Sequence, residues 1–458
     1  MVVVFVFVAL LVLAAVVAAN WYVWRRLFRD TTRGPGWARR GGAALIAGGW
    51  VLAVAALVAE RAGAPFWLQR TLAWPGFLWL ALSIYLLLGV VAGEAVRPLL
   101  RRLVERRARR MRPDTAAADA PPEPPVPAAV TGTSGPELRT APGRTSAPEP
   151  RTAFGRTSAS SPAPVPPASS VSPAAPTPAT ALAAPSRRVF VSRVVGGAAA
   201  TAAVGTVGYG TYGVLRGPRV KRVTVPLAKL PRSADGFRIA VVSDIHLGPI
   251  LGRGFAQKVV DTINATRPDL IAVVGDLVDG SVKDLGPAAA PLAQLRARHG
   301  AYFVTGNHEY FSGAEQWVEE VRLLGLHPLE NARTELPGFD LAGVNDLQGE
   351  SEGQGPDFGR ALGDRDTARA CVLLAHQPVQ IHEAVRHGVD LQLSGHTHGG
   401  QLWPGNLIAA AANPTVAGLE RYGDTQLYVS RGAGAWGPPT RVGAPSDITV
   451  IRLVSKQA

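Results

Sequence analysis

Residues 390–400 read Asp-Leu-Gln-Leu-Ser-Gly-His-Thr-His-Gly-Gly, an apolar strand that runs into two histidines two residues apart. Side chains two positions apart at the end of a strand lie on the same side of the chain. The flanking glycines let the backbone turn tightly and approach a bound ion or phosphate closely. One such segment binds an ion weakly, so a metal site needs ligands from further segments.

Four segments upstream also consist of an apolar strand followed by a short polar tip. They are 239–243 before Asp244 and His246, 270–274 before Asp276, 302–305 before Asn307, His308 and Glu309, and 372–375 before His376. Functional residues of α/β sheets gather beyond the carboxyl ends of strands. Five of the nine histidines fall in these tips, although the tips are a small part of the chain, so chance does not account for the pattern.

This mixed set of oxygen and nitrogen donors is larger than one transition-metal ion needs. It divides naturally between two ions about 3.5–4 Å apart with one bridging carboxylate. Such a pair stabilises both the attacking and the leaving oxygen of a phosphoryl displacement and supplies a metal-bound hydroxide at neutral pH. The sequence therefore predicts a two-metal phosphohydrolase. Mn, Fe and Zn all suit these ligands, so the identity of the metal stays open.

The ordered blocks resemble those of the calcineurin-like metallophosphoesterases over about residues 220–458. The blocks are Asp244-x-His246, Gly275-Asp276, Gly306-Asn307-His308-Glu309, His376 and Gly395-His396-x-His398. The longer forms at 395–401 and 430–434, and Pro-Pro-Thr-Arg at 438–441, resemble the membrane-associated bacterial branch. That branch includes twin-arginine-exported members and lipid-sugar diphosphate hydrolases. One block departs from the pattern, because residues 445–448 read Pro-Ser-Asp-Ile where Pro-Glu-Ile is common.

The resemblance implies a role for each matching residue. Asp244, His246 and His398 would hold the first metal, Asn307, His376 and His396 the second, and Asp276 would bridge them. His308 would lie by the leaving group and donate a proton, as a general acid does near neutral pH.

Four further residues lie close to these motifs in the sequence. Glu309 would orient His308 or fix the local turn, and Asp279 is expected to support the ligands or form a turn. Arg431 and Arg441 are candidates for binding a phosphate oxygen in bidentate fashion.

Residues 219–458 alternate short apolar strands with amphipathic segments, which favours an α/β domain with a largely parallel core. Region 339–345 and the C-terminal strands are candidates for antiparallel pairing. With the resemblance, this predicts a metallophosphoesterase-type β-sandwich flanked by helices. The single cysteine, Cys371, lies inside an apolar strand and is expected to be a small buried hydrophobic residue.

Residues 1–112 form a predicted helical transmembrane region with apolar spans at about 2–20, 43–59 and 74–93. A signal peptide is the competing interpretation of the first span, but no basic residues precede it. Residues 113–185 are rich in Pro, Ala, Ser and Thr and are predicted to be a disordered linker.

Residues 186–218 resemble a twin-arginine export signal, with Arg187-Arg188 before a mildly hydrophobic stretch. An ordinary basic flank before a fourth span is the alternative. Gly197, Thr201, Gly205 and Gly208 share one helical face, which predicts close packing of that face against another span.

Arginines are dense between the first two spans and after the third, and sparse between the second and third. Basic loops stay in the cytoplasm, which predicts a multi-pass protein of the cell membrane with its catalytic domain on the extracytoplasmic side. Arg216, Arg219, Lys221 and Arg222 after the fourth span argue against this placement.

The net charge of +13 is unevenly distributed. Residues 1–218 hold 24 Arg and Lys against 9 Asp and Glu, whereas residues 219–458 hold 23 against 25. The catalytic half therefore has no electrostatic footprint for nucleic acid. The predicted partners are the lipid bilayer and a phosphorylated small-molecule or lipid substrate. The alternatives are a binding or sensor module that has kept the fold, and a nuclease of the same fold.

Overall fold

The computed structural model describes residues 2–110 and 186–457. The predicted linker at 113–185 lies outside these residues. Residues 1–103 and 186–458 form one compact unit, and the helix that continues beyond residue 103 enters a second unit, 104–185.

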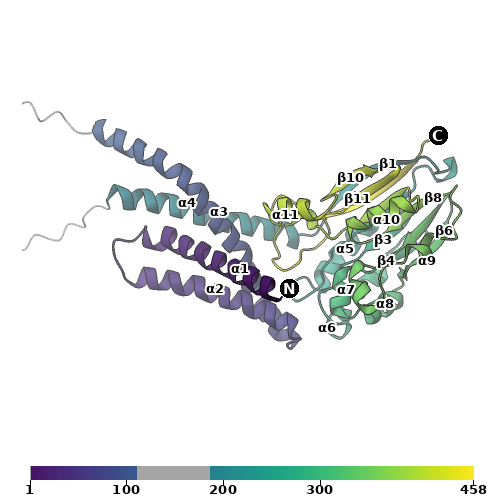
Figure 1. Ribbon diagram of the computed structural model, residues 1–458, viewed down its shortest axis with the longest axis horizontal. Coiled ribbons are helices and arrows are strands. Elements are labelled where there is room, and N and C mark those ends of the chain that lie inside the picture. The colour runs from purple at the N-terminus through teal and green to yellow at the C-terminus, as the bar shows by residue number, and fades with distance from the viewer. Residues whose placement is uncertain (1, 111–185, 458) are drawn as a thin grey trace, which may run out of the picture. The chain divides into compact units, whose positions relative to one another are not determined.

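Residues 219–455 form a sandwich of two six-stranded sheets, drawn in Figure 1. The first sheet has the order β1 (Arg219–Leu227), β12 (Asp447–Ser455), β2 (Arg238–Val242), β3 (Leu270–Val274), β4 (Ala301–Val304), β5 (His327–Pro328). The second has the order β10 (Gly418–Tyr422), β11 (Thr425–Val429), β9 (Leu391–Ser394), β8 (Ala370–Leu374), β7 (Phe339–Gly343), β6 (Ala332–Leu336). The antiparallel pairs are β12 with β2, β6 with β7, and β10 with β11, which confirms a largely parallel core.

Alternate residues of each central strand face opposite layers, as the strand period of two requires. Ile239 and Val241 of β2 lie between the two sheets, whereas Ala240 and Val242 face the helices outside. The first sheet is covered by α5 (Arg253–Ala265), α6 (Val282–Ala289) and α8 (Ala314–Leu323), and the second by α9 (Phe358–Leu362) and α10 (Ile381–Arg386).

Strand register brings the polar tips together. Strands β2, β3 and β4 are parallel neighbours, with Val242 opposite Val273 and Val274 opposite Val304. Strands β8 and β9 are parallel neighbours in the other sheet, with Leu374 opposite Leu393. All five tips therefore leave the sandwich at the same edge, where one site can collect them.

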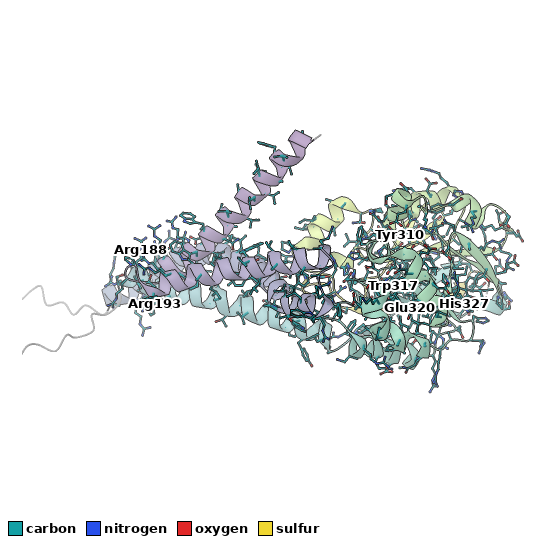
Figure 2. The ribbon with its side chains drawn as sticks, turned by 90° about the horizontal axis from the view of Figure 1, so that it is seen from below. Arg188, Arg193, Tyr310, Trp317, Glu320 and His327 are labelled. Atoms are coloured by element: carbon teal, nitrogen blue, oxygen red, sulfur yellow. The ribbon has the colours of Figure 1, made fainter. Side chains whose placement is uncertain are left out.

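Within residues 2–110 and 186–457, four helices are long and apolar enough to cross a membrane. They are α1 (Val2–Trp24), α2 (Trp37–Arg61), α3 (Phe66–Arg110) and α4 (Arg187–Leu215), and each predicted span lies inside one of them. In Figure 2, Arg188 and Arg193 near the start of α4 lie far from Tyr310 and Trp317 of the sandwich.

The buried face of α4 differs from the predicted one. Gly197, Gly205 and Gly208 point into open space, with no described atom within 4 Å of an added Cβ. Val195 and Ala199 are buried instead, and Ala199 approaches Gly89 of α3. Small residues on both helices permit close approach, because a Cβ at Gly93 of α3 would lie 2.6 Å from Val195 and one at Gly210 of α4 would lie 2.7 Å from the carbonyl oxygen of Arg441.

Candidate metal centre

Five of the proposed ligands have a left-handed backbone, which residues other than glycine rarely adopt. Their φ angles are 51° for Asp244, 49° for His246, 52° for Asp276, 71° for His396 and 52° for His398. Each such residue costs about 1–3 kcal/mol and persists only where the surrounding structure enforces it. This strain is concentrated at the strand tips, which marks them as a functional site.

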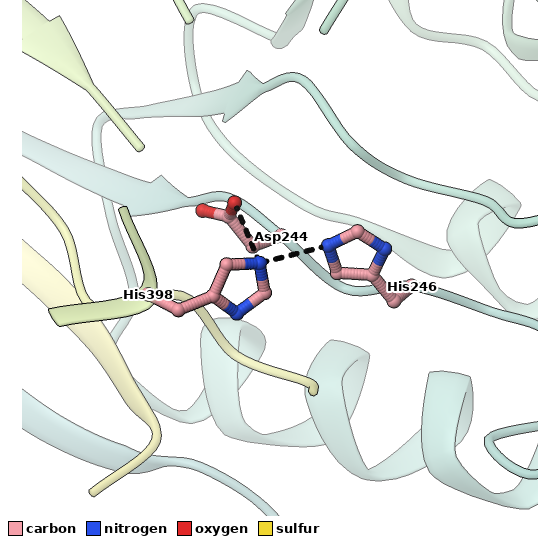
Figure 3. Close-up of side chains that lie close together, drawn as sticks. All are labelled: Asp244, His246 and His398. Atoms are coloured by element: carbon pink, nitrogen blue, oxygen red, sulfur yellow. Dashed lines mark hydrogen bonds and ion pairs between the residues drawn. The ribbon is translucent and has the colours of Figure 1, made fainter. Parts of the chain in front are cut away.

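The first group of side chains is Asp244, His246 and His398, shown in Figure 3. Nε2 of His398 lies 3.0 Å from Nε2 of His246 and 3.4 Å from Oδ1 of Asp244. All three side chains are largely buried. Gly395 permits this approach, because a Cβ there would lie 2.4 Å from Oδ2 of Asp244.

The second group is Asp276, His376 and His396. Oδ2 of Asp276 lies 3.1 Å from Nε2 of His376. The amide oxygen of Asn307, at the start of α7 (Asn307–Ser312), lies 3.0 Å from Nδ1 of His396. The structure thus brings together all four residues predicted at this position.

Asp276 lies between the two groups. The same oxygen that faces His376 is 3.8 Å from Nε2 of His246 in the first group. Its other oxygen accepts a hydrogen bond from the backbone N–H of His308 at 2.9 Å, which fixes the carboxylate. This is the geometry that a bridging carboxylate needs.

The hydrogen-bond partners of the rings leave one nitrogen of each facing the cluster. Nδ1 of His376 lies 2.9 Å from the carbonyl oxygen of Val274 and donates to it, so Nε2 faces the Asp276 carboxylate at 3.1 Å. Nδ1 of His246 faces the Asp279 carboxylate, so its Nε2 lone pair points at His398. Arg441 has only donors, so Nδ1 of His398 accepts from it, and the proton of this neutral ring lies on Nε2, which donates to Nε2 of His246. A metal ion held by these rings would take the place of the protons between them.

The electrostatics of the site agree with cation binding. Burial alone would raise the pKa of Asp276, but His376 and His246 outweigh it and hold that pKa well below its usual value. Burial and the nearby His376 lower the pKa of His396 to about 4, and burial and His246 lower that of His398 well below its usual value. Asp276, His396 and His398 are thus in the forms that bind metals. Burial raises the pKa of Asp244, and the Asp276 carboxylate outweighs burial and raises the pKa of His376 well above its usual value, so a metal ion would displace the protons of these two side chains.

His308 lies beside these groups without belonging to either. Its Nδ1 is 2.7 Å from Oδ1 of Asp279, the same oxygen that holds His246. Burial opposes its protonation, but the Asp279 carboxylate prevails and raises the pKa of His308 to about 9. His308 is therefore a cation at neutral pH and has a proton to donate. Of the two roles predicted for Asp279 from its place three residues after Asp276, this geometry favours the support of a ligand.

Glu309 fixes the loops and has no hydrogen bond to His308 among the described contacts. Its carboxylate accepts from the backbone N–H groups of Asp276, Leu277 and Gly306 at 2.9, 2.7 and 2.6 Å. Of the two predicted roles, this geometry favours the structural one.

The two arginines differ from the prediction of phosphate binding. Arg441 is buried, and its guanidinium faces Nδ1 of His398 at 3.0 Å and the carbonyl oxygens of His398, Gly434 and Ala444. Its donors are thus engaged by the protein, and a substrate phosphate has no access to them. Arg431 packs beside Gly399 and is not among the described residues that line the cavity over the cluster. Sequence pattern could not reveal this, because the partners of a guanidinium depend on packing.

Comparison with known proteins identifies similar chains. The family profile of calcineurin-like phosphoesterases matches residues 237–400. A zebrafish transmembrane protein with a metallophosphoesterase domain is 40% identical over 265 residues, which cover 55% of this chain and 60% of that one. The match thus spans about three fifths of that relative.

Two bacterial relatives are covered almost completely. An uncharacterised metallophosphoesterase of Aquifex aeolicus is 35% identical over 243 residues, 52% of this chain and 92% of its own. One from Bacillus subtilis is 31% identical over 284 residues, 59% of this chain and 98% of its own. Among solved structures, a zebrafish dimetal phosphatase aligns with a TM-score of 0.33 and 14% identity, over 47% of this chain and 91% of that one.

Proposed function

The chain belongs to the calcineurin-like metallophosphoesterases and is a metal-dependent hydrolase. From this premise we propose that it is a membrane-anchored enzyme that cleaves a phosphoester, phosphodiester or pyrophosphate bond. We propose a lipid or another cell-envelope compound as its substrate. The observation that carries the proposal is the position of Asp276, whose Oδ2 faces one imidazole of each ligand group.

Each side chain has one task in this proposal. Asp244, His246 and His398 would hold one divalent cation, Asn307, His376 and His396 would hold the other, and Asp276 would serve both. When bound, two such cations supply positive charge to the phosphoryl oxygens and lower the pKa of water. Mn, Fe and Zn all suit these donors.

His308 supplies the proton. Water adds to phosphorus and releases a proton to solvent while the bond from phosphorus to the leaving oxygen breaks. The leaving oxygen takes the proton from His308, and His308 regains a proton from solvent before the next turnover. Asp279 keeps the imidazole charged and oriented until the proton is transferred.

The helices support a membrane anchor with the catalytic domain on the extracytoplasmic side. Near the start of α4, Nε of Arg193 donates to the carbonyl of Thr31, in the basic connection between α1 and α2. At the other end of α4, Leu215 packs against the core of the sandwich. The basic loops and the catalytic domain thus lie at opposite ends of a span, and basic loops stay in the cytoplasm. Arg219 and Lys221 belong to strand β1 and are part of the folded domain.

Helix α11 (Gly405–Ala412) supports a position at the membrane surface. Trp403, Leu407 and Ile408 in and before it are 53%, 65% and 76% exposed. The hydroxyl of Tyr85 in α3 donates to the carbonyl of Trp403 at 3.0 Å, so this apolar segment adjoins a proposed span. Exposed apolar surface next to such a helix fits the bilayer interface.

The test is hydrolysis of bis(p-nitrophenyl) phosphate and p-nitrophenyl phosphate by the full-length protein in detergent, metal-free and with added manganese. Asp276→Ala should abolish turnover, and Asp261→Ala, a control on the exposed face of α5, should keep it. The preferred ester then narrows the substrate class. A folded, metal-loaded protein without turnover would instead favour the binding-module alternative.

A further inference from the structure

A cavity of about 600 Å³ lies directly over the ligand cluster, and the two apolar helices α2 and α3 form part of its wall. Its floor includes Asp276, Asn307 and His396. On the opposite side it is lined by Leu57 of α2 and by Phe77 and Leu80 of α3. The sequence assigned no task to these helices beyond anchoring.

The apolar part of the cavity continues around His308. The rings of Phe311 and Trp436 lie 5.5 and 5.6 Å from the His308 ring, centroid to centroid. Both side chains also line the cavity and are about half exposed. The position where a leaving group would take its proton is therefore flanked by apolar surface, which suits a hydrocarbon better than a highly charged group.

The polar part of the wall lies at the end of α2. Arg61, the last residue of this helix, has its guanidinium carbon 6.0 Å from the centre of the Phe311 ring. It is the one Arg or Lys among the described residues that line the cavity. A cation at that point can contact a phosphate that rests on the cluster. Glu60 beside it offers an acceptor for a hydroxyl group.

The proposed span of α2 ends at Arg61, so the polar part of the cavity wall lies where this helix would leave the hydrocarbon. Phospholipids carry their phosphate at this level and their chains along the helices below it.

We propose that α2 and α3 complete the substrate site, and that its ligand is a membrane lipid with its phosphate group on the cluster and Arg61 and its hydrocarbon chain along Leu57, Phe77 and Leu80. The inference deepens the proposed phosphohydrolase function and rests on it. It assigns a lipid-binding task to helices that would otherwise be a plain anchor.

The first experiment uses two diester substrates, methyl p-nitrophenyl phosphate and dodecyl p-nitrophenyl phosphate, with the full-length protein in one detergent. The reacting group is the same in both, so the ratio of their kcat/KM values reports the hydrocarbon chain alone. We expect this ratio to exceed tenfold in the wild type and to fall about tenfold in Leu57→Gln. Leu52→Gln is the matched control, because Leu52 lies on the same helix with similar exposure (37% against 43%) and does not line the cavity.

A ratio that falls equally in both variants would assign the effect to the micelle and overturn the inference. A ratio near one in the wild type would also overturn it while leaving the hydrolase intact. Loss of all turnover, with both esters, would count against the proposed function.

A binding measurement tests the lipid-binding proposal separately from the proposed hydrolase function, because it does not depend on catalysis. Phe311→Cys places a thiol in the cavity, and Leu323→Cys places one on α8, where residue 323 is 74% exposed and outside the cavity. Dodecyl phosphate should slow maleimide labelling of the first thiol at least fivefold and leave the second unaffected, whereas inorganic phosphate should protect neither. Equal protection by both ligands would identify a site for free phosphate and overturn the lipid assignment.

Discussion

Nδ1 of His308 lies 2.7 Å from Oδ1 of Asp279, and Nδ1 of His246 lies 2.8 Å from the same oxygen. One carboxylate oxygen therefore orients a proposed metal ligand and the proposed proton donor together. Burial would raise the pKa of Asp279, but the two histidines outweigh it and lower this pKa to about 2. The carboxylate is thus ionised throughout the neutral range.

Asp279→Asn should therefore impair metal binding and catalysis at once. The amide keeps an acceptor oxygen but is neutral, so it loses the charge that strengthens both hydrogen bonds and keeps His308 protonated. We expect metal affinity and kcat each to fall about 10–100-fold, the usual effect of removing a partner of a metal ligand. Metal titration followed by kinetics at saturating metal would measure the two separately. If the kcat of the variant at saturating metal equals that of the wild type, Asp279 supports only His246.

Arg441→Lys should weaken metal binding and spare substrate affinity. A lysine cannot reproduce the contacts with Nδ1 of His398 and three carbonyl oxygens, so the ring of His398 loses its support. We expect the Kd for the metal to rise about tenfold or more, with KM unchanged at saturating metal. Arg431→Lys is the matched control. A higher KM with an unchanged metal Kd would restore the original prediction that Arg441 binds phosphate.

Glu309→Gln should lower stability. The carboxylate accepts three backbone N–H groups, and an amide nitrogen in place of one oxygen leaves at least one buried donor unpaired. Such a donor costs about 1–3 kcal/mol, which corresponds to a melting temperature lower by roughly 2–12 °C. Thermal unfolding in detergent would measure this. Glu319→Gln, at an exposed position paired only with Arg322, should change the melting temperature little. Equal changes of melting temperature in the two variants would refute the structural role of Glu309.

Cys371 should be inert in the folded protein. Its side chain is fully buried, and burial raises the pKa of its thiol to about 12, so almost no thiolate exists at pH 8. Because it is the single cysteine, a disulfide-exchange reagent should release no colour from the native chain and one equivalent after denaturation. Leu323→Cys should react at once and serves as the positive control. Fast labelling of the native wild type would show that strand β8 opens readily.

The strand tips illustrate what pattern alone can predict. An apolar strand that ends in Asp-x-His or His-x-His predicts two things from a few residues. The apolar run predicts the strand, and the polar tip supplies the donor atoms. Parallel strands must then deliver their ends to one edge, so the cluster around Asp276 followed from the sequence. The structure adds that five of these residues bear positive φ angles, a strain that no residue pattern displays.

The sequence by itself thus predicted the α/β domain and the cluster of donor side chains, and its family resemblance predicted the sandwich, the seven proposed ligands and the proposed proton donor. Only the tertiary structure decided which way Arg441 turns, which face of α4 is buried and which two rings share Asp279. It also placed Leu57 and Arg61 beside a cluster more than 180 residues away in the chain. The physical reason is that donor chemistry and strand period are local properties, whereas packing depends on which apolar surfaces bury each other best across the whole fold.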